Sequence, residues 1–516
     1  MADRYNAAEW LVDRHLQRGD GGRTAFICEG SQLTYLDLQR QVWRAQHALR
    51  DLDVRLGERV LMVVNDEPAF PAWFLGALRS GVVPVPVSTM LTADDLGAIA
   101  ADAGAGVAVV SAPYAGHLGV IVAAAPELRA AVVVGGAAVA DEAGAIVRRW
   151  DSFDDLTDAP VAPTTADTPG FWLYSSGTTG TPKGVMHRHA NLEATASTYA
   201  RSVLGIRPED RCLSVAKLFF AYGLGNSLTF PLAVGASSVL NPVRPTPAGV
   251  AQLLATHRPT LFFASPGFIA ALLDSDVPDE AFGPVRLAVT AGETLPAELQ
   301  RRFEARFDVP VLDGIGSTEA LHIFLSNHPD RRRPGTTGIP VAGYAVKLLD
   351  DEDREVTAAG TPGYLHVRGP STATGYWCRT EATQAAFRGD WLRTGDVYTR
   401  SDDGYFSFLG RNNDMIKAGG IWVSPAEVEA VLVEHPDVLE AAVVGSRTGD
   451  GLEMTVAFVV PRGGHTIDDA SIEAHCRARM AAFKRPRRVI VLNDLPKTAT
   501  GKVQRFALRD RLVLGS

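Results

Sequence analysis

The stretch YSSGTTGTPKGVMHRH at residues 174–189 holds the residue types that bind phosphate. Its glycines, Gly177 and Gly180, permit tight turns and a close approach of the backbone to a ligand. Consecutive backbone N–H groups in such a turn form an anion-binding concavity, to which serine and threonine hydroxyls add donors and Lys183 adds charge. The stretch is not a Walker A loop, because Pro182 precedes the lysine and a glycine follows it. We therefore expect a phosphate-binding loop of another kind.

The composition narrows the classes of protein to which the chain can belong. Its 516 residues, 46% of them hydrophobic and 21% charged, predict several folded units with large cores. A net charge of −9 argues against nucleic acid as the main partner. The charged N-terminus has no apolar signal segment, and no run of about 18 apolar residues would span a membrane. The sequence therefore predicts a cytoplasmic protein without a membrane partner, with its four cysteines as free thiols.

Short apolar runs alternate with helical patterns through the first 320 residues or so and predict an α/β fold. A helix is expected at 68–81. Buried strands are expected in two series, at 59–66, 81–88, 106–111 and 130–136, and at 237–241, 260–266, 286–293 and 310–319. Apolar strands separated by helices form parallel sheets, so two doubly wound sheets are predicted. A further strand at 171–176 leads directly into the phosphate-binding stretch.

The pattern changes near residue 335. Between about 335 and 410 the apolar residues alternate with period two among Gly, Pro and Asp turns, which predicts an antiparallel or barrel-like unit. After a break at 410–414, helical and strand patterns of about 100 residues are enough for a separate small α+β domain. We therefore divide the chain into a large domain at 1–412 and a small one at 413–516.

The string at 174–185 resembles the phosphate loop of the AMP-forming adenylating enzymes, a superfamily of acyl- and aryl-CoA ligases, nonribosomal adenylation domains and luciferases. Four further motifs follow in the order that this superfamily has them. They resemble its acyl-pocket segment, its adenine and magnesium segment, its ribose and hinge segment, and its C-terminal lysine motif: 217–236, 313–324, 391–429 and 495–505. The strings KLFFAYGLGN and DGIGSTEALH are most similar to the benzoate–CoA ligase branch.

The resemblance implies a reaction in two halves that uses ATP, Mg²⁺ and coenzyme A. A carboxylate attacks the α-phosphate of ATP, giving an acyl-adenylate and pyrophosphate, and a thiol then displaces AMP. The first half brings two anions together, so neutralisation of charge should dominate its catalysis. Glu319 would bind the magnesium ion, and Lys502 would bridge the carboxylate and the α-phosphate. Thr178 and Lys183 complete the expected catalytic set.

The implied nucleotide site draws on several motifs. Thr318 would touch the α-phosphate, and Asp396, assisted by Arg411, would accept hydrogen bonds from both ribose hydroxyls. Adenine would rest on Ile315, where many members of the superfamily have an aromatic residue. The β- and γ-phosphates would be held by Ser175, Ser176, Gly177, Thr178, Thr179, Gly180 and Lys183. The adenine surroundings would be completed by Gly292, Glu293, Asp313 and Gly314.

The implied acyl pocket has aromatic walls and small residues, which suit a flat ring. Its expected members are Phe220, Ala221, Tyr222, Ala291, Gly314, Gly316, Leu321 and His322. His322 would face the carboxylate or a ring substituent, or would be a hydrogen-bonded residue of the wall. The two glycines would also leave room for a bulkier acid. No Asp or Arg of this set pairs with a substrate amine or second carboxylate, which favours benzoate or a lightly substituted aryl acid.

The hinge between the two expected domains departs from the superfamily. Asn413 stands where an Asp or Lys is usual, and a hinge residue must absorb the change of dihedral angles when the C-terminal domain rotates between the two half-reactions. Asn tolerates unusual backbone angles better than most residues. After the rotation, the pantetheine tunnel would be lined by Lys417, Gly419, Gly420 and Trp422.

Three hypotheses follow for the function. The first is an aryl-CoA ligase. The second is a stand-alone adenylating enzyme that activates a bulkier natural-product acid or loads a carrier protein. The third is a binding protein that has kept the fold without the activity, against which the intact set Lys183, Glu319, Asp396 and Lys502 argues. A homodimer is a further assembly that the resemblance leaves open.

Overall fold

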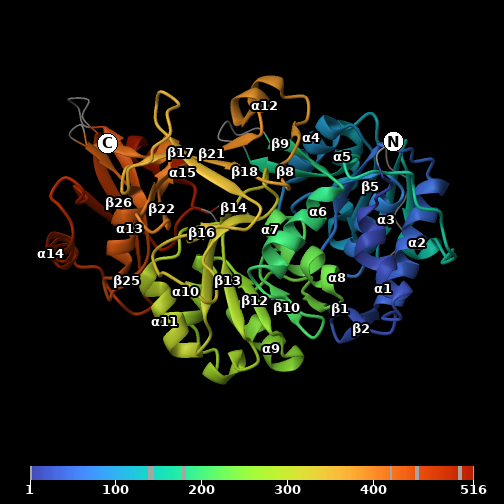
Figure 1. The fold of residues 1–516 in the computed structure, drawn as a ribbon, viewed down its shortest axis with the longest axis horizontal. Coiled ribbons are helices and arrows are strands. Elements are labelled where there is room, and N and C mark those ends of the chain that lie inside the picture. The colour runs from blue at the N-terminus through green and yellow to red at the C-terminus, as the bar shows by residue number, and fades with distance from the viewer. Residues whose placement is uncertain are drawn as a thin grey trace.

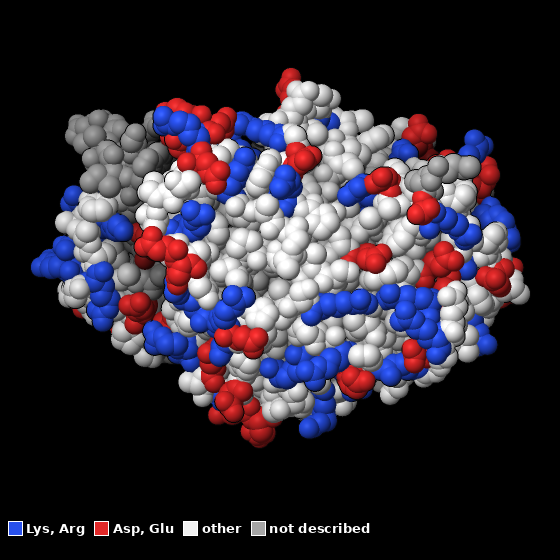
Figure 2. Space-filling view, viewed as in Figure 1, with Lys and Arg blue, Asp and Glu red and all other residues white. Residues whose placement is uncertain are grey.

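The computed structural model describes residues 3–136, 144–176, 182–418, 421–447, 453–497 and 503–514. The N-terminal half lies on the right of Figure 1 and the C-terminal region on the left, beside α10 and α11. Within the described residues, no helix is both long and apolar enough to cross a membrane. Acidic and basic side chains are interspersed on the face shown in Figure 2, and neither sign forms a continuous patch there.

Five strands form a wholly parallel sheet in the order β4-β3-β5-β6-β7. Its strands are β3 (Arg59–Val63), β4 (Val83–Pro86), β5 (Ala105–Ser111), β6 (Ala130–Val134) and β7 (Ile146–Arg149). The helices between them are α3 (Ala69–Arg79), α4 (Ala93–Ala103) and α5 (Leu118–Ala124). This part confirms the first predicted series of strands and the helix at 68–81.

The side chains of this sheet alternate between two cores, as the period of two requires. Val60 and Met62 pack toward α3 in the main core, while Leu61 and Val63 pack with α4 and α5 in a separate one. The main core continues into the second sheet. Burial on both faces explains why the strand sequences are almost continuously apolar.

The second sheet has nine strands in the order β16-β15-β14-β13-β12-β10-β11-β1-β2. The pairs from β14 to β1 are parallel, and β2, β15 and β16 add antiparallel edges. The strands are β1 (Thr24–Cys28), β2 (Ser31–Thr34), β10 (Arg211–Ser214), β11 (Ser237–Leu240), β12 (Leu261–Ala264), β13 (Leu287–Thr290), β14 (Val311–Gly316), β15 (Ile323–Ser326) and β16 (Ile339–Pro340). The second predicted series of strands is thus confirmed.

Helices and short helical turns surround these sheets. The helices are α1 (Arg14–Gln17), α2 (Tyr35–Asp51), α6 (Ala190–Thr195), α9 (Pro247–His257), α10 (Pro266–Leu273) and α11 (Ala297–Phe307). The short turns are η1 (Glu9–Asp13), η2 (Ala112–His117), η3 (Trp150–Ser152), η4 (Ala196–Arg201), η6 (Asp279–Phe282) and η7 (Asn412–Asp414).

One continuous helix from 221 to 234 contains a π-helical turn. It consists of α7 (Ala221–Leu224), η5 (Gly225–Thr229) and α8 (Phe230–Val234). It ends at Gly235, which has a left-handed conformation with φ of 81°. Such π-turns are frequent at functional sites.

The phosphate-binding stretch is the turn of a β-hairpin. β8 (Pro169–Ser176) and β9 (Pro182–Arg188) pair antiparallel, and β19 (Gly375–Tyr376) adds a third strand. The sequence predicted the first of these strands but not β9, whose proline, glycine and charged residues hide its pattern. The hairpin holds both ends of the predicted loop.

The unit predicted between about 335 and 410 is an antiparallel sheet. Its strands are β17 (Ala345–Leu349), β18 (Gly363–Arg368), β20 (Phe387–Arg388), β21 (Trp391–Arg400) and β22 (Phe406–Arg411). A short helix, α12 (Thr380–Ala386), precedes β20. Among the described residues, the strand pairs do not close into a barrel, so the antiparallel alternative is the one confirmed.

A separate sheet follows in the C-terminal region, in the order β24-β23-β26-β25 with β27 beside β26. Its strands are β23 (Ile416–Ala418), β24 (Ile421–Val423), β25 (Val438–Arg447), β26 (Glu453–Pro461) and β27 (Arg488–Val491). Its helices are α13 (Pro425–Val433), α14 (Asp469–Arg479) and α15 (Arg505–Leu514). The region has two cores of its own, as an α+β unit should.

Candidate active site

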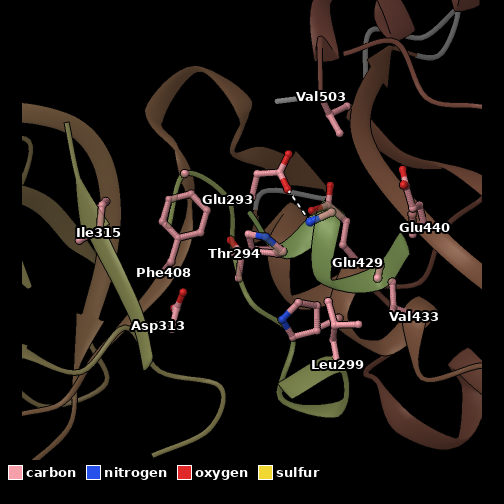
Figure 3. Close-up of a pocket in the computed structure, with 18 of the residues that line it drawn as sticks. Glu293, Thr294, Leu299, Asp313, Ile315, Phe408, Glu429, Val433, Glu440 and Val503 are labelled. Atoms are coloured by element: carbon pink, nitrogen blue, oxygen red, sulfur yellow. Dashed lines mark hydrogen bonds between the residues drawn. The ribbon is translucent and has the colours of Figure 1, made fainter. Parts of the chain in front are cut away.

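A cavity of about 340 Å³ lies between the carboxyl ends of β13 and β14 and the C-terminal region (Figure 3). Ligands of open α/β sheets usually bind at this edge. Its lining from the N-terminal side includes Gly292, Glu293, Asp313, Gly314, Ile315, Gly316, Asp396 and Arg411. The structure thus gathers most of the predicted adenine and ribose residues around one space, with Ile315 and Phe408 near each other in Figure 3.

The C-terminal region supplies the opposite wall of this cavity. Glu429 and Val433 of α13 and Glu440 of β25 lie there in Figure 3. Lys497 and Val503 also line it. In the sequence these two residues flank 498–502, which carries Lys502 and lies outside the described residues.

Asp396 and Arg411 form the ion pair at the predicted ribose position. They are opposite each other on β21 and β22, and Arg411 Nε lies 2.9 Å from Asp396 Oδ1. Asp396 is only 3% exposed. The neighbouring carboxylate of Asp396 is the main cause that raises the pKa of Arg411. A buried, paired carboxylate at the cavity wall suits hydrogen bonding to hydroxyl groups.

Asp313 and Glu293 lie on the same edge of the sheet. Burial raises the pKa of Asp313 well above its usual range, although Thr290 Oγ1 lies within 3.3 Å of Asp313 Oδ1 and donates to it. A hydrogen-bond donor on a bound molecule would stabilise the charged form. The Glu293 carboxylate accepts a hydrogen bond of 3.2 Å from the backbone N–H of Gly267, at the start of α10 (dashed line in Figure 3).

Lys183 and Glu319 come together through a tyrosine that the sequence did not indicate. Tyr376 Oη donates a hydrogen bond of 2.9 Å to Glu319 Oε1. Lys183 Nζ lies 5.3 Å from the centre of the same ring. The pairing of β19 with β9 places Tyr376 there. Burial and the Glu319 carboxylate raise the pKa of Tyr376, so its hydroxyl stays a donor.

His187 fastens the hairpin to the segment that contains Thr318. Its Nδ1 accepts from Asn191 Nδ2 at 2.9 Å, so its Nε2 donates to the Thr318 carbonyl at 2.8 Å. The ring also stacks on Phe171, with 5.0 Å between centroids. Burial lowers the pKa of His187 to about 4, which keeps it neutral. The sequence signal for His187 was its place in the HRH end of the phosphate-binding stretch.

An aromatic wall surrounds His322. The ring centroids of Tyr222 and Phe230 lie 5.5 and 4.5 Å from that of His322, and Tyr199 lies at 5.3 Å. His322 Nε2 is hydrogen bonded to Asn226 Oδ1 at 3.2 Å, and burial lowers the pKa of His322 to about 3. His322 is thus a buried, hydrogen-bonded member of this aromatic cluster, and its predicted place toward the acid stays a prediction. Tyr222, Asn226 and Phe230 follow one another at helical spacing, which was the signal for the two that were not predicted.

The other predicted acyl-pocket residues lie close by. Phe220 makes an edge contact with Phe219, with 4.6 Å between ring centroids. Ala221 begins α7. Ala291 and Leu321 are buried in the main core, and Leu321 has a left-handed φ of 66°, which is strained for a bulky residue. Strain of this kind clusters at functional sites.

The two glycines of β14 are required by the sheet itself. A Cβ at Gly316 would lie 2.5 Å from the carbonyl oxygen of His322, and one at Gly314 would lie 2.8 Å from a side-chain carbon of Ile323. The space beside both glycines is therefore occupied by β15 and the residue before it. The prediction that they leave room for a bulkier acid is wrong in this respect. Both still line the cavity, beside Ile315.

Several predicted residues lie outside the described residues: Gly177, Thr178, Thr179, Gly180, Gly419, Gly420 and Lys502. Ser175 pairs with Lys183, and Ser176 with Pro182, at the base of the hairpin. Lys417 and Trp422 are backbone partners in β23 and β24. Asn413 lies in the short turn η7, directly after β22. The predicted hinge therefore falls between the two sheets.

Two family models match the chain. The model described as AMP-binding enzyme matches residues 12–377, and the model of the AMP-binding enzyme C-terminal domain matches residues 427–502. The chain belongs to the AMP-binding enzyme family. The resemblance seen in the five motifs is thereby confirmed.

Within the AMP-binding enzyme family, the chain is similar to ligases of aromatic acids. It is 46% identical to a benzoate–CoA ligase of Thauera aromatica, over 99% of this chain and 96% of the relative. A solved benzoate CoA ligase from Burkholderia xenovorans LB400 superposes with a TM-score of 0.89 at 41% identity, covering 98% of this chain and 100% of that one. The anthranilate CoA ligase AuaEII, solved with anthranoyl-AMP, gives 0.94 at 37% identity, covering 99% and 98%. The predicted benzoate–CoA ligase branch and α/β fold class are thus supported.

Proposed function

We propose that this protein is an ATP-dependent aryl-CoA ligase that acts on benzoate or a substituted benzoate. The observation that carries the proposal is the aromatic cluster of Tyr222, Phe230 and His322, in which Phe230 and His322 are buried and Tyr222 is partly exposed. A flat, uncharged ring would pack against Tyr222, the partly exposed member of this cluster, since aromatic pairs prefer offset or edge contacts. The aryl-CoA ligases among the relatives, at 46% and 40% identity, support the same class of acid.

Each half-reaction assigns roles to this chain's own residues. In the first, the acid's carboxylate oxygen bonds to the α-phosphorus while the bond to pyrophosphate breaks. We assign the pyrophosphate to the hairpin turn with Lys183, the ribose to Asp396, and the adenine to the face of Ile315. Lys502 would neutralise the charge shared by the carboxylate and the α-phosphate. In the second, the thiol sulfur of coenzyme A bonds to the acyl carbon, AMP leaves, and the thiol proton is released.

Glu319 fits the role of a magnesium ligand. Mg²⁺ prefers oxygen ligands and in nucleotide sites usually needs only one or two protein carboxylates. Tyr376 donates to one oxygen of Glu319 and so orients the group while it remains a carboxylate. When bound, the ion would screen the phosphate charges and so make the attack by an anion easier. His187 holds the neighbouring Thr318 backbone in place for the same region.

Replacing Tyr376 by phenylalanine tests this orientation. The ring over Lys183 is kept, while the hydrogen bond to Glu319 is lost. A hydrogen bond to a charged group is worth about 1.5–3 kcal/mol, so we expect the Mg²⁺ concentration for half-maximal pyrophosphate release to rise about tenfold. Tyr405→Phe is the matched control, because its hydroxyl donates to the Arg331 carbonyl at the surface. An unchanged Mg²⁺ dependence would contradict the role of Tyr376.

We further propose that the region from 413 onward is a mobile domain and that the observed arrangement is the one for adenylation. Lys497 and Val503, the described residues on either side of the segment that carries Lys502, both line the cavity, which supports this. Arg462 of the C-terminal region forms an ion pair with the N-terminal region: it lies 3.2 Å from Asp274 at the end of α10. Arg302 of α11 approaches the same carboxylate at 3.8 Å. Only the first of these pairs would break when the C-terminal domain rotates.

Arg462→Ala should therefore affect the two half-reactions differently. A half-exposed ion pair is worth about 0.2–1 kcal/mol, so we expect adenylation to slow by roughly two- to fivefold. Thioester formation from a supplied benzoyl-adenylate should not slow. Arg302→Ala, which removes a pair within the N-terminal region, should leave the ratio of the two rates unchanged. Equal slowing of both half-reactions by Arg462→Ala would count against the proposed arrangement.

The identities of the acid and of the thiol that accepts the acyl group are tested by measuring pyrophosphate release across a panel of acids, with and without coenzyme A. The panel should include benzoate, hydroxy- and aminobenzoates and a long-chain fatty acid, because Asn226 places polar atoms in the aromatic wall. We expect release with benzoates and a CoA thioester when coenzyme A is present. Adenylation without transfer to coenzyme A would favour the carrier-loading alternative, which a relative named p-hydroxybenzoic acid–AMP ligase, at 34% identity, keeps open. Release with the fatty acid alone would overturn the proposed class.

A further inference from the structure

A buried carboxylate outside the cavity contacts the segment that carries Phe220 and Tyr222. Asp66 follows β3 and is 3% exposed. One of its carboxylate oxygens accepts a hydrogen bond of 3.0 Å from the backbone N–H of Leu218. Leu218 belongs to residues 216–223, here called the gate segment, which includes Phe220 and Tyr222. Asp66 therefore connects the first sheet with the start of the gate segment.

Lys217 holds the gate segment from the other direction. Its Nζ donates to the carbonyl oxygen of Val243 at 2.7 Å and also to that of Asn241, both in the chain that follows β11. Burial lowers the pKa of Lys217, and the Asp66 carboxylate opposes this effect. Burial raises the pKa of Asp66 to about 6, an effect that Lys217 and the Leu218 N–H reduce. The two groups thus stabilise each other's charge in a buried place.

The gate segment is a tight loop with little freedom to move. Phe220 N–H donates to the Lys217 carbonyl at 3.0 Å. A Cβ at Gly223 would lie only 2.0 Å from that same carbonyl oxygen, so a glycine is required there. A shift at Leu218 would therefore be passed on to Phe220 and Tyr222. The Tyr222 hydroxyl in turn donates to the Val289 carbonyl at 3.0 Å.

The loop that carries Asp66 is itself anchored to the end of β5. Asn65 N–H donates to Ser111 Oγ at 3.0 Å, and Tyr114 Oη donates to Asn65 Oδ1 at 3.1 Å. The next residue, Glu67, accepts a hydrogen bond from the Ser111 hydroxyl, at the end of β5. Asp66 therefore lies on a loop that is hydrogen bonded to the end of β5, and its own hydrogen bond links this loop to the gate segment.

We propose that Asp66 and Lys217 are positioning residues. By holding the gate segment in place, they strengthen the binding of the aromatic acid. The proposal rests on the proposed function, since it assigns the aromatic acid to a place beside Phe220 and Tyr222 of this segment. Neither residue lines the cavity that we assign to the nucleotide. The effect of changing them should therefore appear in the KM for the acid and not in the KM for ATP.

The experiment measures kcat and both KM values by pyrophosphate release for Asp66→Ala, Asp66→Asn and Lys217→Met, with benzoate as the acid. We expect Asp66→Ala to raise the KM for benzoate about tenfold, because a buried N–H loses its acceptor, with the KM for ATP within about twofold of the parent. Asp66→Asn keeps an acceptor oxygen and should recover most of the loss. Lys217→Met should show the same split. Glu67→Gln is the matched control and should behave like the parent.

Each other outcome has a defined meaning. An equal rise of both KM values, or no change in the KM for benzoate with Asp66→Ala, would overturn the positioning role. Should Asp66→Ala fail to fold, Asp66→Asn and Lys217→Met still decide, because parent-like constants in Lys217→Met would contradict the role. A parent that activates neither benzoate nor a substituted benzoate would overturn the proposed function itself, and with it this assignment.

Discussion

Replacing Lys502 by alanine should slow acid-dependent pyrophosphate release by about 10²–10³-fold, the usual cost of losing one contact that is made in the transition state. The expectation follows from charge. The first half-reaction joins two anions, and a cation between the carboxylate and the α-phosphate lowers the energy of that encounter. Lys497 and Val503, the described residues on either side of the segment that carries Lys502, line the same cavity as Asp313 and Asp396.

The same variant should keep most of its thioester half-reaction. Supplied with synthetic benzoyl-adenylate and coenzyme A, Lys502→Ala should form the thioester within about threefold of the parent rate, because that step no longer joins two anions. Single-turnover measurements of both halves separate the effects. Lys347→Ala, a lysine that lies over Trp391 in the antiparallel sheet, is the control. Equal losses in both halves would rule out the role given to Lys502.

Asp396→Ala should raise the KM for ATP by at least about a hundredfold, because two hydrogen bonds to a charged group, each worth about 1.5–3 kcal/mol, are lost. Asp396 is buried and paired with Arg411, so its removal also leaves a guanidinium without its partner at the cavity wall. Asp396→Asn should lose less, since one oxygen and the shape of the side chain remain. The KM for the acid should change little in both variants.

Steady-state kinetics with ATP varied at saturating benzoate check this expectation. Asp403→Ala is a suitable control, because Asp403 pairs with Arg333 at the surface, where ion pairs contribute little. Should the KM for ATP stay at the parent value in Asp396→Ala, the ribose would have to bind elsewhere than at this pair.

Elements with strong periodicity could be predicted from the sequence. β3 and β5 are nearly continuous apolar runs because they are buried on both faces, and α3 lies between β3 and β4 as its spacing indicates. β9 was missed because its proline, glycine and histidine pack through tertiary contacts and not through a repeating pattern. Whether these antiparallel strands form an open sheet or a barrel could not be predicted either, since the alternation of apolar residues describes one strand at a time.

Motif spacing located the cavity residues but not their supports. Asp396 and Arg411 meet because adjacent antiparallel strands place them opposite each other. Tyr376 reaches Glu319 from 57 residues away, and Asp66 reaches Leu218 from 152 residues away. Such pairs depend on how the sheets lie against one another, which no local signal contains. The roles of Gly314 and Gly316 were misjudged for the same reason, because β15 could not be seen beside them.

The most direct test of the central claim is the product balance with benzoate, ATP, Mg²⁺ and coenzyme A. Chromatography with mass detection should find benzoyl-CoA, AMP and pyrophosphate in equal amounts, with none of them formed when benzoate is left out. ADP and phosphate in place of AMP and pyrophosphate, or AMP formed without any thioester, would contradict an AMP-forming aryl-CoA ligase.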